Sequence, residues 1–262
     1  MRTPSEQAEL QNALNKLCEW TDQWSMKFNE SKCHVIHFGS RNNNYDYHMN
    51  GVKLLHVTDE RDVGVNISET LKPTKHCTKI VNTAKGILRN ISRSFHYRDK
   101  NIFLKLYTTY VRCHLEYCTP VWSPHSQSDV DLIESVQVKA VGMISGLHAK
   151  DYEGKLKELN LLSLKARRER FDMIETYKIL HRVNNVDPST WFELVPSDRG
   201  TTTRLTSCDL NLVGKRCNLD VRKHFFSNRV TNSWNRLPSE IKTARTVIQF
   251  KTMYDEHLKN AN

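Results

Sequence analysis

Apolar residues recur at two spacings along this chain, one helical and one alternating. Leu10, Leu14 and Leu17 lie three or four residues apart, which predicts an amphipathic helix over residues 5–20. Helical spacing returns after residue 70, and Ser128 with Asp131 forms a possible capping box for the third helix there, which is expected to end at Gly146. The apolar series of these three helices are Ile80, Ala84, Ile87 and Ile91; Phe103, Leu106, Tyr107 and Tyr110; and Ile133, Val136, Ala140, Met143 and Ile144.

Between residues 33 and 69 apolar and polar residues alternate instead, as they do in strands. The dipeptide Asn50-Gly51 separates two alternating arms and predicts a hairpin, because both turn residues must adopt positive φ. Further strands are expected at residues 35–38 and 62–67. Together these segments predict a small antiparallel sheet.

The remainder of the chain predicts two helices over residues 151–184, ended by Asp187-Pro188. The sequence therefore predicts an α+β fold: an N-terminal helix and a small antiparallel sheet, then a mainly helical bundle and a helical C-terminal region. The expected segments are residues 1–69, a helical bundle over 70–150, a basic helical connector over 151–195, a flexible polar linker over 196–221, and a compact piece over 222–262.

Charge is distributed unevenly between these segments. Residues 1–69 carry 7 Lys and Arg against 10 Asp and Glu, whereas the rest of the chain carries 32 against 19. A basic surplus of this kind favours a polyanionic partner, of which nucleic acid is the commonest, although a solvated lysine-rich surface has the same composition.

The seven cysteines are odd in number and form no Cys-x-x-Cys pair, which predicts reduced thiols in an intracellular protein, in nucleus or cytoplasm. No apolar run is long enough to cross a membrane, and no signal peptide opens the chain. Two short clusters could offer zinc ligands, but neither supplies four, so no metal site is expected. The two clusters are Cys33, His34 and His37, and Cys113, His114 and Cys118.

Four stretches, in order, carry a resemblance to one family. They are WTDQWSMKFNESKCHVIHF from residue 20, YHMNGVKL with RDVGVNI, YTTYVRCHLEYCTPVWSPHS, and FFSNRVTNSWNRLP. Any one alone is unspecific, but together they resemble the part of non-LTR retrotransposon (LINE, jockey-like) reverse transcriptases that follows the catalytic Tyr-Ala-Asp-Asp box. The chain departs from the family at Val63, where Leu is usual, and at Cys113, where Pro is usual.

This resemblance implies the end of a polymerase palm (1–69), a thumb and a C-terminal extension. Two-metal nucleotidyl transfer needs closely spaced carboxylates, and no two aspartates are adjacent in this chain. We therefore expect it to be inactive alone, with Mg²⁺ belonging to a missing catalytic segment and no cofactor of its own. Met1 is expected to be a gene-model start or a truncation point.

The resemblance also implies roles for individual residues. Lys32 is a candidate proton donor to the departing pyrophosphate, or a surface lysine beside a turn. Val63, Gly64 and Val65 are candidates for the primer grip, or for a β-bulge. The candidate nucleic-acid contacts are Arg112, Arg167, Arg168, Arg170 and Arg182, for which an Arg112–Glu116 pair and a solvated helix face are the alternatives.

The predicted partner is an RNA/DNA template-primer, with the missing polymerase and endonuclease parts as possible protein partners and no small-molecule substrate. Two alternatives stay open. The chain could be a retained nucleic-acid-binding or protein-interaction scaffold, or a decayed, non-functional open reading frame.

Overall fold

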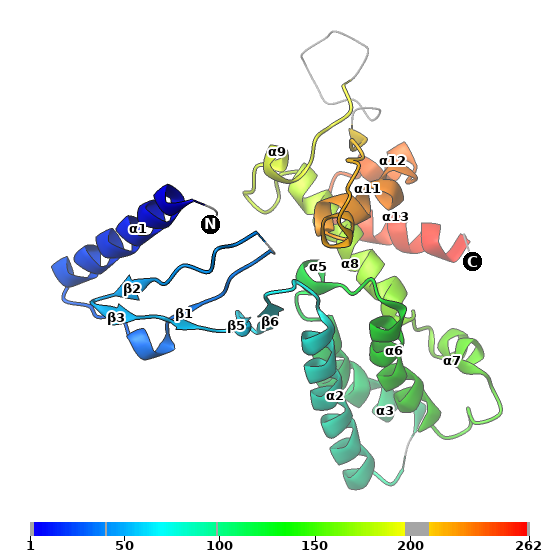
Figure 1. Ribbon diagram of the computed structural model, residues 1–262. Helices are drawn as coiled ribbons and strands as arrows, with labels where there is room; N and C mark the ends of the chain where they lie inside the picture. Colours follow the sequence, from blue (N-terminus) through cyan, green and yellow to red (C-terminus); the bar gives the residue numbers. More distant parts are fainter. Residues whose placement is uncertain (1–2, 40, 98, 197–209, 261–262) are drawn as a thin grey trace. The chain divides into compact units, whose positions relative to one another are not determined.

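The computed structural model describes residues 3–39, 41–97, 99–196 and 210–260. The chain divides into two compact units, Met1–His76 and Cys77–Asn262 (Figure 1). Helices dominate and the strands form small two-stranded sheets, so the predicted α+β class is confirmed. The predicted boundaries near residues 150 and 195 both lie inside the second unit.

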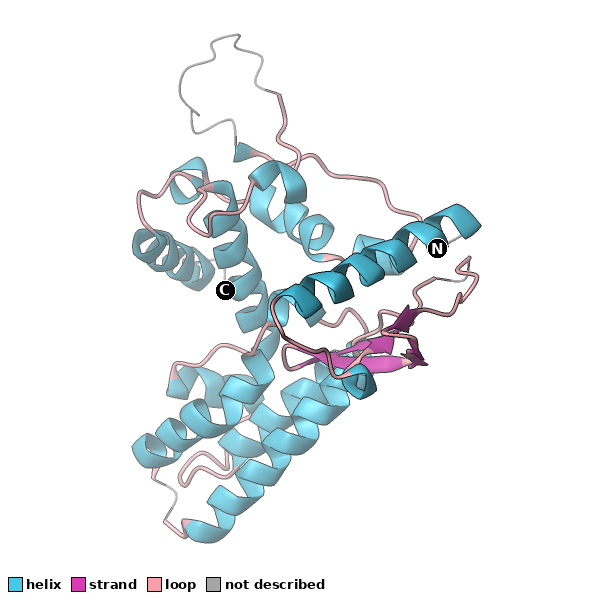
Figure 2. Cartoon of the chain, turned by 90° about the vertical axis from the view of Figure 1, so that its left-hand side faces the viewer, coloured by secondary structure: helices cyan, strands magenta, loops and turns pink. Residues whose placement is uncertain are grey.

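The first unit packs one helix over short strands (Figure 2). Helix α1 (Pro4–Gln23) begins at Thr3, whose side chain accepts from the Glu6 amide while the Glu6 carboxylate accepts from the Thr3 amide. The core beneath α1 is small. Its buried members are Cys18, Tyr47, Met49 and Leu54, with Leu10, Leu14, Phe28 and Val35 half-buried around them.

The predicted Asn50-Gly51 hairpin is confirmed. It joins β2 (His48–Met49) to β3 (Val52–Lys53), and both turn residues have positive φ, 51° and 78°. In contrast, β1 (His34–Val35) pairs in parallel with β4 (Leu55–His56), where an antiparallel sheet was predicted. Alternation specifies which side chains share a face, but it does not specify the direction of the partner strand.

A second hairpin replaces the single strand predicted over residues 62–67. It consists of β5 (Asp59–Asp62) and β6 (Val65–Ser68) and turns at Val63 and Gly64, with φ of 43° and 87°. The prediction was wrong because valine favours extended backbone, so nothing but Gly64 marked a turn.

The long helix α2 (Thr74–Ser94) starts at the end of the first unit and forms the first element of the second, which begins at Cys77. Its buried stripe is displaced from the predicted series, because Ile80 and Ile87 lie half-buried at its edge. The buried residues of α2 are Cys77, Val81, Ala84, Leu88 and Ile91.

The next segment is helical with an irregularity in its middle. A π-helical turn over Tyr107–Val111 buries Tyr107 at 1% exposure and leaves Tyr110 at 56%, so assigning both tyrosines to the core was wrong for Tyr110. The predicted capping box is also absent, since the third helix already begins at Gln127. The helices here are α3 (Lys100–Leu106), α4 (Arg112–Glu116), α5 (Thr119–Trp122) and α6 (Gln127–Gly142).

Helix α8 (Leu164–Leu180) links the two halves of this unit, because it contacts α4, α5, α6, α11 and α13. A buried polar network fixes its start. The amide of Gln137 accepts from Tyr107 at 2.8 Å and donates to the Leu162 carbonyl at 3.0 Å, and Glu134 accepts from the Leu164 amide at 3.1 Å. The preceding helix is α7 (Tyr152–Leu159).

The C-terminal half packs around Tyr177, Trp234 and Phe250, each at most 1% exposed. Part of the predicted linker belongs to this core: Leu210 and Leu212 are buried, and Leu212 bridges to Leu194. Residues 197–209 of that predicted linker lie outside the described residues. The helices are α9 (Pro188–Trp191), α10 (Asp220–Lys223), α11 (Phe226–Asn235), α12 (Ser239–Lys242) and α13 (Val247–Asn260).

Candidate nucleic-acid interface

Helix α2 carries several basic residues and no carboxylate of its own. Its 21 residues include five Lys and Arg and no Asp or Glu. Lys79, Arg89 and Arg93 are exposed on the face opposite the buried stripe, since residues 79, 86, 89 and 93 share one side at helical spacing. We name this the α2 basic face, and its members are Lys75, Lys79, Asn82, Gly86, Arg89, Asn90 and Arg93.

Gly86 lies in the middle of the α2 basic face. A glycine inside a helix costs about 1 kcal/mol relative to alanine. No atom lies within 4 Å of the position that a Gly86 Cβ would occupy, so packing does not require the glycine. Its effect is to expose helix backbone between Lys79 and Arg89.

The β5–β6 hairpin is attached to the first turn of α2. The Lys75 ammonium lies 2.6 Å from the Asp59 carboxylate, and the Asn66 amide donates to Nδ1 of His76 at 3.2 Å. The hydrogen bond from Lys75 holds the pKa of Asp59 below its usual value. These contacts lie within the first unit and hold the hairpin with the predicted primer-grip residues against Lys75 and His76.

The hairpin tip presents Val63, whose side chain is 77% exposed, while Val65 is buried. A β-branched residue at positive φ is a backbone outlier with a cost of about 1–2 kcal/mol. Gly64 is the second turn residue, so the alternative of a β-bulge does not describe it. An exposed apolar side chain on strained backbone is an unusual feature that marks a candidate site.

Most of the arginines predicted to contact nucleic acid pair instead with carboxylates of the same chain. Arg167 makes two hydrogen bonds with the Glu116 carboxylate, the second of 3.0 Å from Nη2. Arg170 holds Asp255 through two bonds of 2.5 and 2.8 Å. The predicted alternative for Arg112 is present, as its Nε lies 3.5 Å from Glu116.

Arg168 is the clearest exception to the predicted basic face, because it is 2% exposed and neither Nη has a hydrogen-bond partner in the described chain. It lines a cavity of about 350 Å³ beside Asp172 and Arg229. Burial lowers the pKa of Arg168. Among the five predicted arginines, only Arg182 is exposed, and it lies just beyond the end of α8.

Lys32 ends a short 3₁₀ turn, Glu30–Lys32, and its side chain is exposed. Neighbouring residues also expose apolar area: Leu17, Trp20, Trp24 and Met26 are each 42–65% exposed. We call this set the N-terminal apolar strip. The Trp20 and Trp24 rings lie 6.4 Å apart, so part of the strip is continuous.

The final motif of the resemblance has a structural part to play. The Trp234 indole donates to the Leu210 carbonyl at 2.7 Å, and the Asn235 amide both donates to and accepts from the Leu212 backbone. Arg229 pairs with Asp172 through two bonds of 2.8 Å. These residues hold the segment after residue 209 against α11 and α8.

Within the described residues no group of three His, Cys, Asp or Glu side chains is placed to hold a metal ion. His34 instead meets Glu60 at 2.5 Å, and the His37 ring lies against His56. Among the described helices, none combines the length and apolar character needed to cross a bilayer.

Sequence reasoning missed the α2 basic face, although its signal is present in the sequence. A helical pattern with pairs of basic residues four positions apart and no acidic residue could have identified Lys79, Arg89 and Arg93. Helix α8 has more arginines and was therefore predicted to contact nucleic acid. Its Arg167 and Arg170 instead pair with carboxylates elsewhere in the chain.

No family model matches this chain, and no curated protein or solved structure matches it significantly. The resemblance to LINE reverse transcriptases therefore stays a prediction, supported by the motifs alone.

Proposed function

We propose that this chain is the end of the palm, the thumb and the C-terminal extension of a non-LTR retrotransposon reverse transcriptase. In this proposal it binds an RNA/DNA template-primer and does not polymerise by itself. The observation that carries the proposal is the α2 basic face, because α2 itself contains no Asp or Glu to repel a phosphate backbone.

The size of the α2 basic face suits a nucleic-acid strand. From Lys79 to Arg93 the helix rises about 21 Å, at about 1.5 Å per residue. Arg89 and Arg93 are exposed and have no ion pair in the described chain, so each can release counterions from a phosphate backbone. Contacts of this type position a duplex without reading its sequence.

Gly86 adds a steric argument. A missing side chain in the centre of a basic face lets a sugar-phosphate backbone approach the helix backbone closely. Because no packing contact explains the glycine, this approach is the reason we assign to it.

The tip of the β5–β6 hairpin fits the predicted grip on the primer end. Its strained, exposed Val63 offers an apolar surface to a nucleotide, and its strands are anchored to α2 through Lys75 and His76. Lys32 keeps its proposed proton-donor role only in a complete palm, where a pyrophosphate would form.

The proposed partners include the missing catalytic palm, which would bring the Mg²⁺-binding aspartates, and the missing endonuclease. The N-terminal apolar strip supports a protein partner of this kind, because exposed large apolar side chains gathered in one place mark interaction surfaces. The proposed location is intracellular, in nucleus or cytoplasm.

The test is binding of the purified chain to a labelled RNA/DNA primer-template, with duplex DNA as competitor, over a salt series. The double variant Arg89→Glu with Arg93→Glu should bind at least tenfold more weakly. Its plot of log affinity against log salt should be shallower by about 1 for each lost phosphate contact. Gly86→Leu keeps every charge and should also weaken binding.

The matched control is Arg245→Glu with Lys259→Glu, which makes the same charge change at exposed positions of the C-terminal half. This control should bind nearly as well as the wild type. Equal losses in the two double variants, or no binding by a folded wild-type sample at low salt, would contradict the proposal.

The second candidate function is a protein-interaction scaffold, favoured by the N-terminal apolar strip. It predicts a stable protein complex that Trp24→Ala weakens and that Arg89→Glu leaves unchanged. The two functions are therefore separated by which variant disrupts binding.

A further inference from the structure

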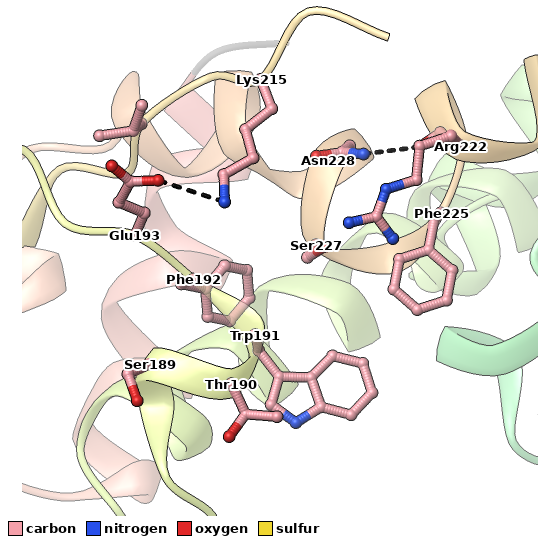
Figure 3. Close-up of a pocket in the computed structure, with 11 residues that line it drawn as sticks. Ser189, Thr190, Trp191, Phe192, Glu193, Lys215, Arg222, Phe225, Ser227 and Asn228 are labelled. Carbon is pink, nitrogen blue, oxygen red and sulfur yellow. Dashed lines mark hydrogen bonds and ion pairs between the residues drawn. The ribbon is translucent and has the colours of Figure 1, made fainter. Parts of the chain in front are cut away.

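A cavity of about 110 Å³ opens between α9 and the start of α11, in the C-terminal half of the second unit (Figure 3). It lies on the same unit as the α2 basic face but is formed by different elements. Phe225, Ser227 and Asn228 come from the final motif of the resemblance, whereas Trp191, Lys215 and Arg222 lie outside the four motifs and outside the α2 basic face. Together they combine exposed aromatic rings with cations.

Two aromatic rings form one side of this cavity. The rings of Trp191 and Phe225 are parallel within 2°, and their centroids are 6.1 Å apart. Both side chains are exposed, at 38% and 43%, so they are not part of the hydrophobic core. Trp191 is held in place by an edge-on contact with Phe226 beneath it, 6.0 Å between centroids.

Cations surround these rings. The Arg222 guanidinium lies 5.2 Å from the centre of the Phe225 ring, and Figure 3 shows it at the mouth of the cavity above that ring. Lys215 reaches the cavity from the opposite side, where it meets Glu193 at 3.2 Å. Because both partners of that pair are more than half exposed, the pair is weak and Lys215 can exchange Glu193 for another anion.

The segment over residues 214–223 extends this positive charge. It exposes four Lys and Arg against one acidic residue, Asp220. The Asn228 amide nitrogen is occupied by the Arg222 carbonyl at 2.6 Å and by Cys217 Sγ at 3.3 Å, so it fixes the loop and is not available to read a ligand. The exposed basic residues are Lys215, Arg216, Arg222 and Lys223.

We propose that this cavity binds an unpaired nucleotide of a single-stranded nucleic acid. The base stacks on the Trp191 and Phe225 rings, and Arg222 with Lys215 holds the adjoining phosphates. Aromatic stacking tolerates any base, and a cationic groove follows the backbone, so this site favours single strands over sequence. The inference goes beyond the proposed duplex binding and does not depend on it.

The test uses the full chain and two fluorescent 12-nucleotide probes, oligo(U) RNA and oligo(dT) DNA, which separate the two possible sources of the nucleotide. Trp191→Ala should lower single-strand affinity roughly tenfold, while Trp191→Phe keeps a ring and should retain most of it. Tryptophan fluorescence should be quenched by the probe in the wild type and quenched less in Trp191→Phe.

The matched control is Trp24→Ala, which removes a tryptophan that is 65% exposed in the first unit. It should bind single strands as the wild type does. The inference is overturned if Trp191→Ala binds like the wild type while remaining folded by circular dichroism, or if both Trp→Ala variants lose equal affinity.

This result is distinguishable from failure of the duplex proposal. Arg89→Glu with Arg93→Glu should lose hybrid binding and keep single-strand binding, and Trp191→Ala should show the reverse. A chain that binds oligo(U) but no hybrid would overturn the duplex proposal alone. A chain that binds the hybrid but neither single strand would overturn this inference alone.

Discussion

Two turns of the same kind in the first unit differ in one residue. Asn50-Gly51 and Val63-Gly64 each join two strands through two residues at positive φ. Asparagine is well suited to this conformation, whereas valine is among the least suited residues. For this reason the first turn could be predicted from the sequence and the second could not. The unfavourable choice at Val63 also bears on function, because it leaves an apolar side chain exposed at the hairpin tip.

Val63→Asn should therefore raise stability and lower binding. Relief of the strained turn should stabilise the hairpin by about 1 kcal/mol, seen as a higher thermal midpoint. Loss of the apolar tip should weaken binding of the RNA/DNA hybrid. Asn50→Val is the reciprocal control, since it introduces the same strain at the other turn and should lower the midpoint. Unchanged hybrid affinity in Val63→Asn would remove the hairpin tip from the interface.

At the scale of elements, periodicity predicted helices well and predicted their charged partners poorly. The helices over α2, α6 and α8 follow from apolar spacing, which depends only on local sequence. The partners of α8 do not, because Arg167 and Arg170 pair with carboxylates 51 and 85 residues away. No spacing rule connects such positions, so residues expected at a polyanion surface are ion-paired or buried within the fold. The π-helical turn after α3 was missed for a related reason, since its sequence reads as continuous helix.

Breaking the Arg229–Asp172 ion pair between α11 and α8 should change the unfolding free energy differently from removing the nearby buried Arg168. Asp172→Asn leaves the half-buried Arg229 guanidinium without its carboxylate and should lower the unfolding free energy by about 3–5 kcal/mol. Arg168→Met removes a buried cation whose Nη atoms have no hydrogen-bond partner, and it should be neutral or stabilising. Urea denaturation measures both. A large loss in Arg168→Met would mean that its guanidinium makes a contact in solution that stabilises the fold.

At the scale of the whole molecule, the two units differ in core size and in charge. Among the described residues, the core cluster beneath α1 contains four buried apolar side chains, and the C-terminal cluster of the second unit contains fifteen. The acidic balance of residues 1–69 and the basic balance of the rest follow the same division closely. That charge difference was readable from the sequence, and it predicted that a polyanionic partner would bind the larger unit. Which basic residues of that unit pair with carboxylates depended on tertiary contacts.

Because the two cores differ in size, the two units should differ in their ability to fold alone. A unit of about 70 residues with so few buried side chains is marginal by itself, whereas a unit near 190 residues can bury a sufficient core. A fragment of residues 70–262 keeps all of α2 and should unfold cooperatively with a midpoint near that of the main transition of the full chain. It should also retain most hybrid binding, because the α2 basic face is intact, and lose only the contribution of the hairpin. A fragment of residues 1–73 should show little cooperative unfolding. Calorimetry and hybrid titration on both fragments check this. If residues 70–262 lost their cooperative transition, the first unit would be part of their folding core, and the α2 basic face would depend on it.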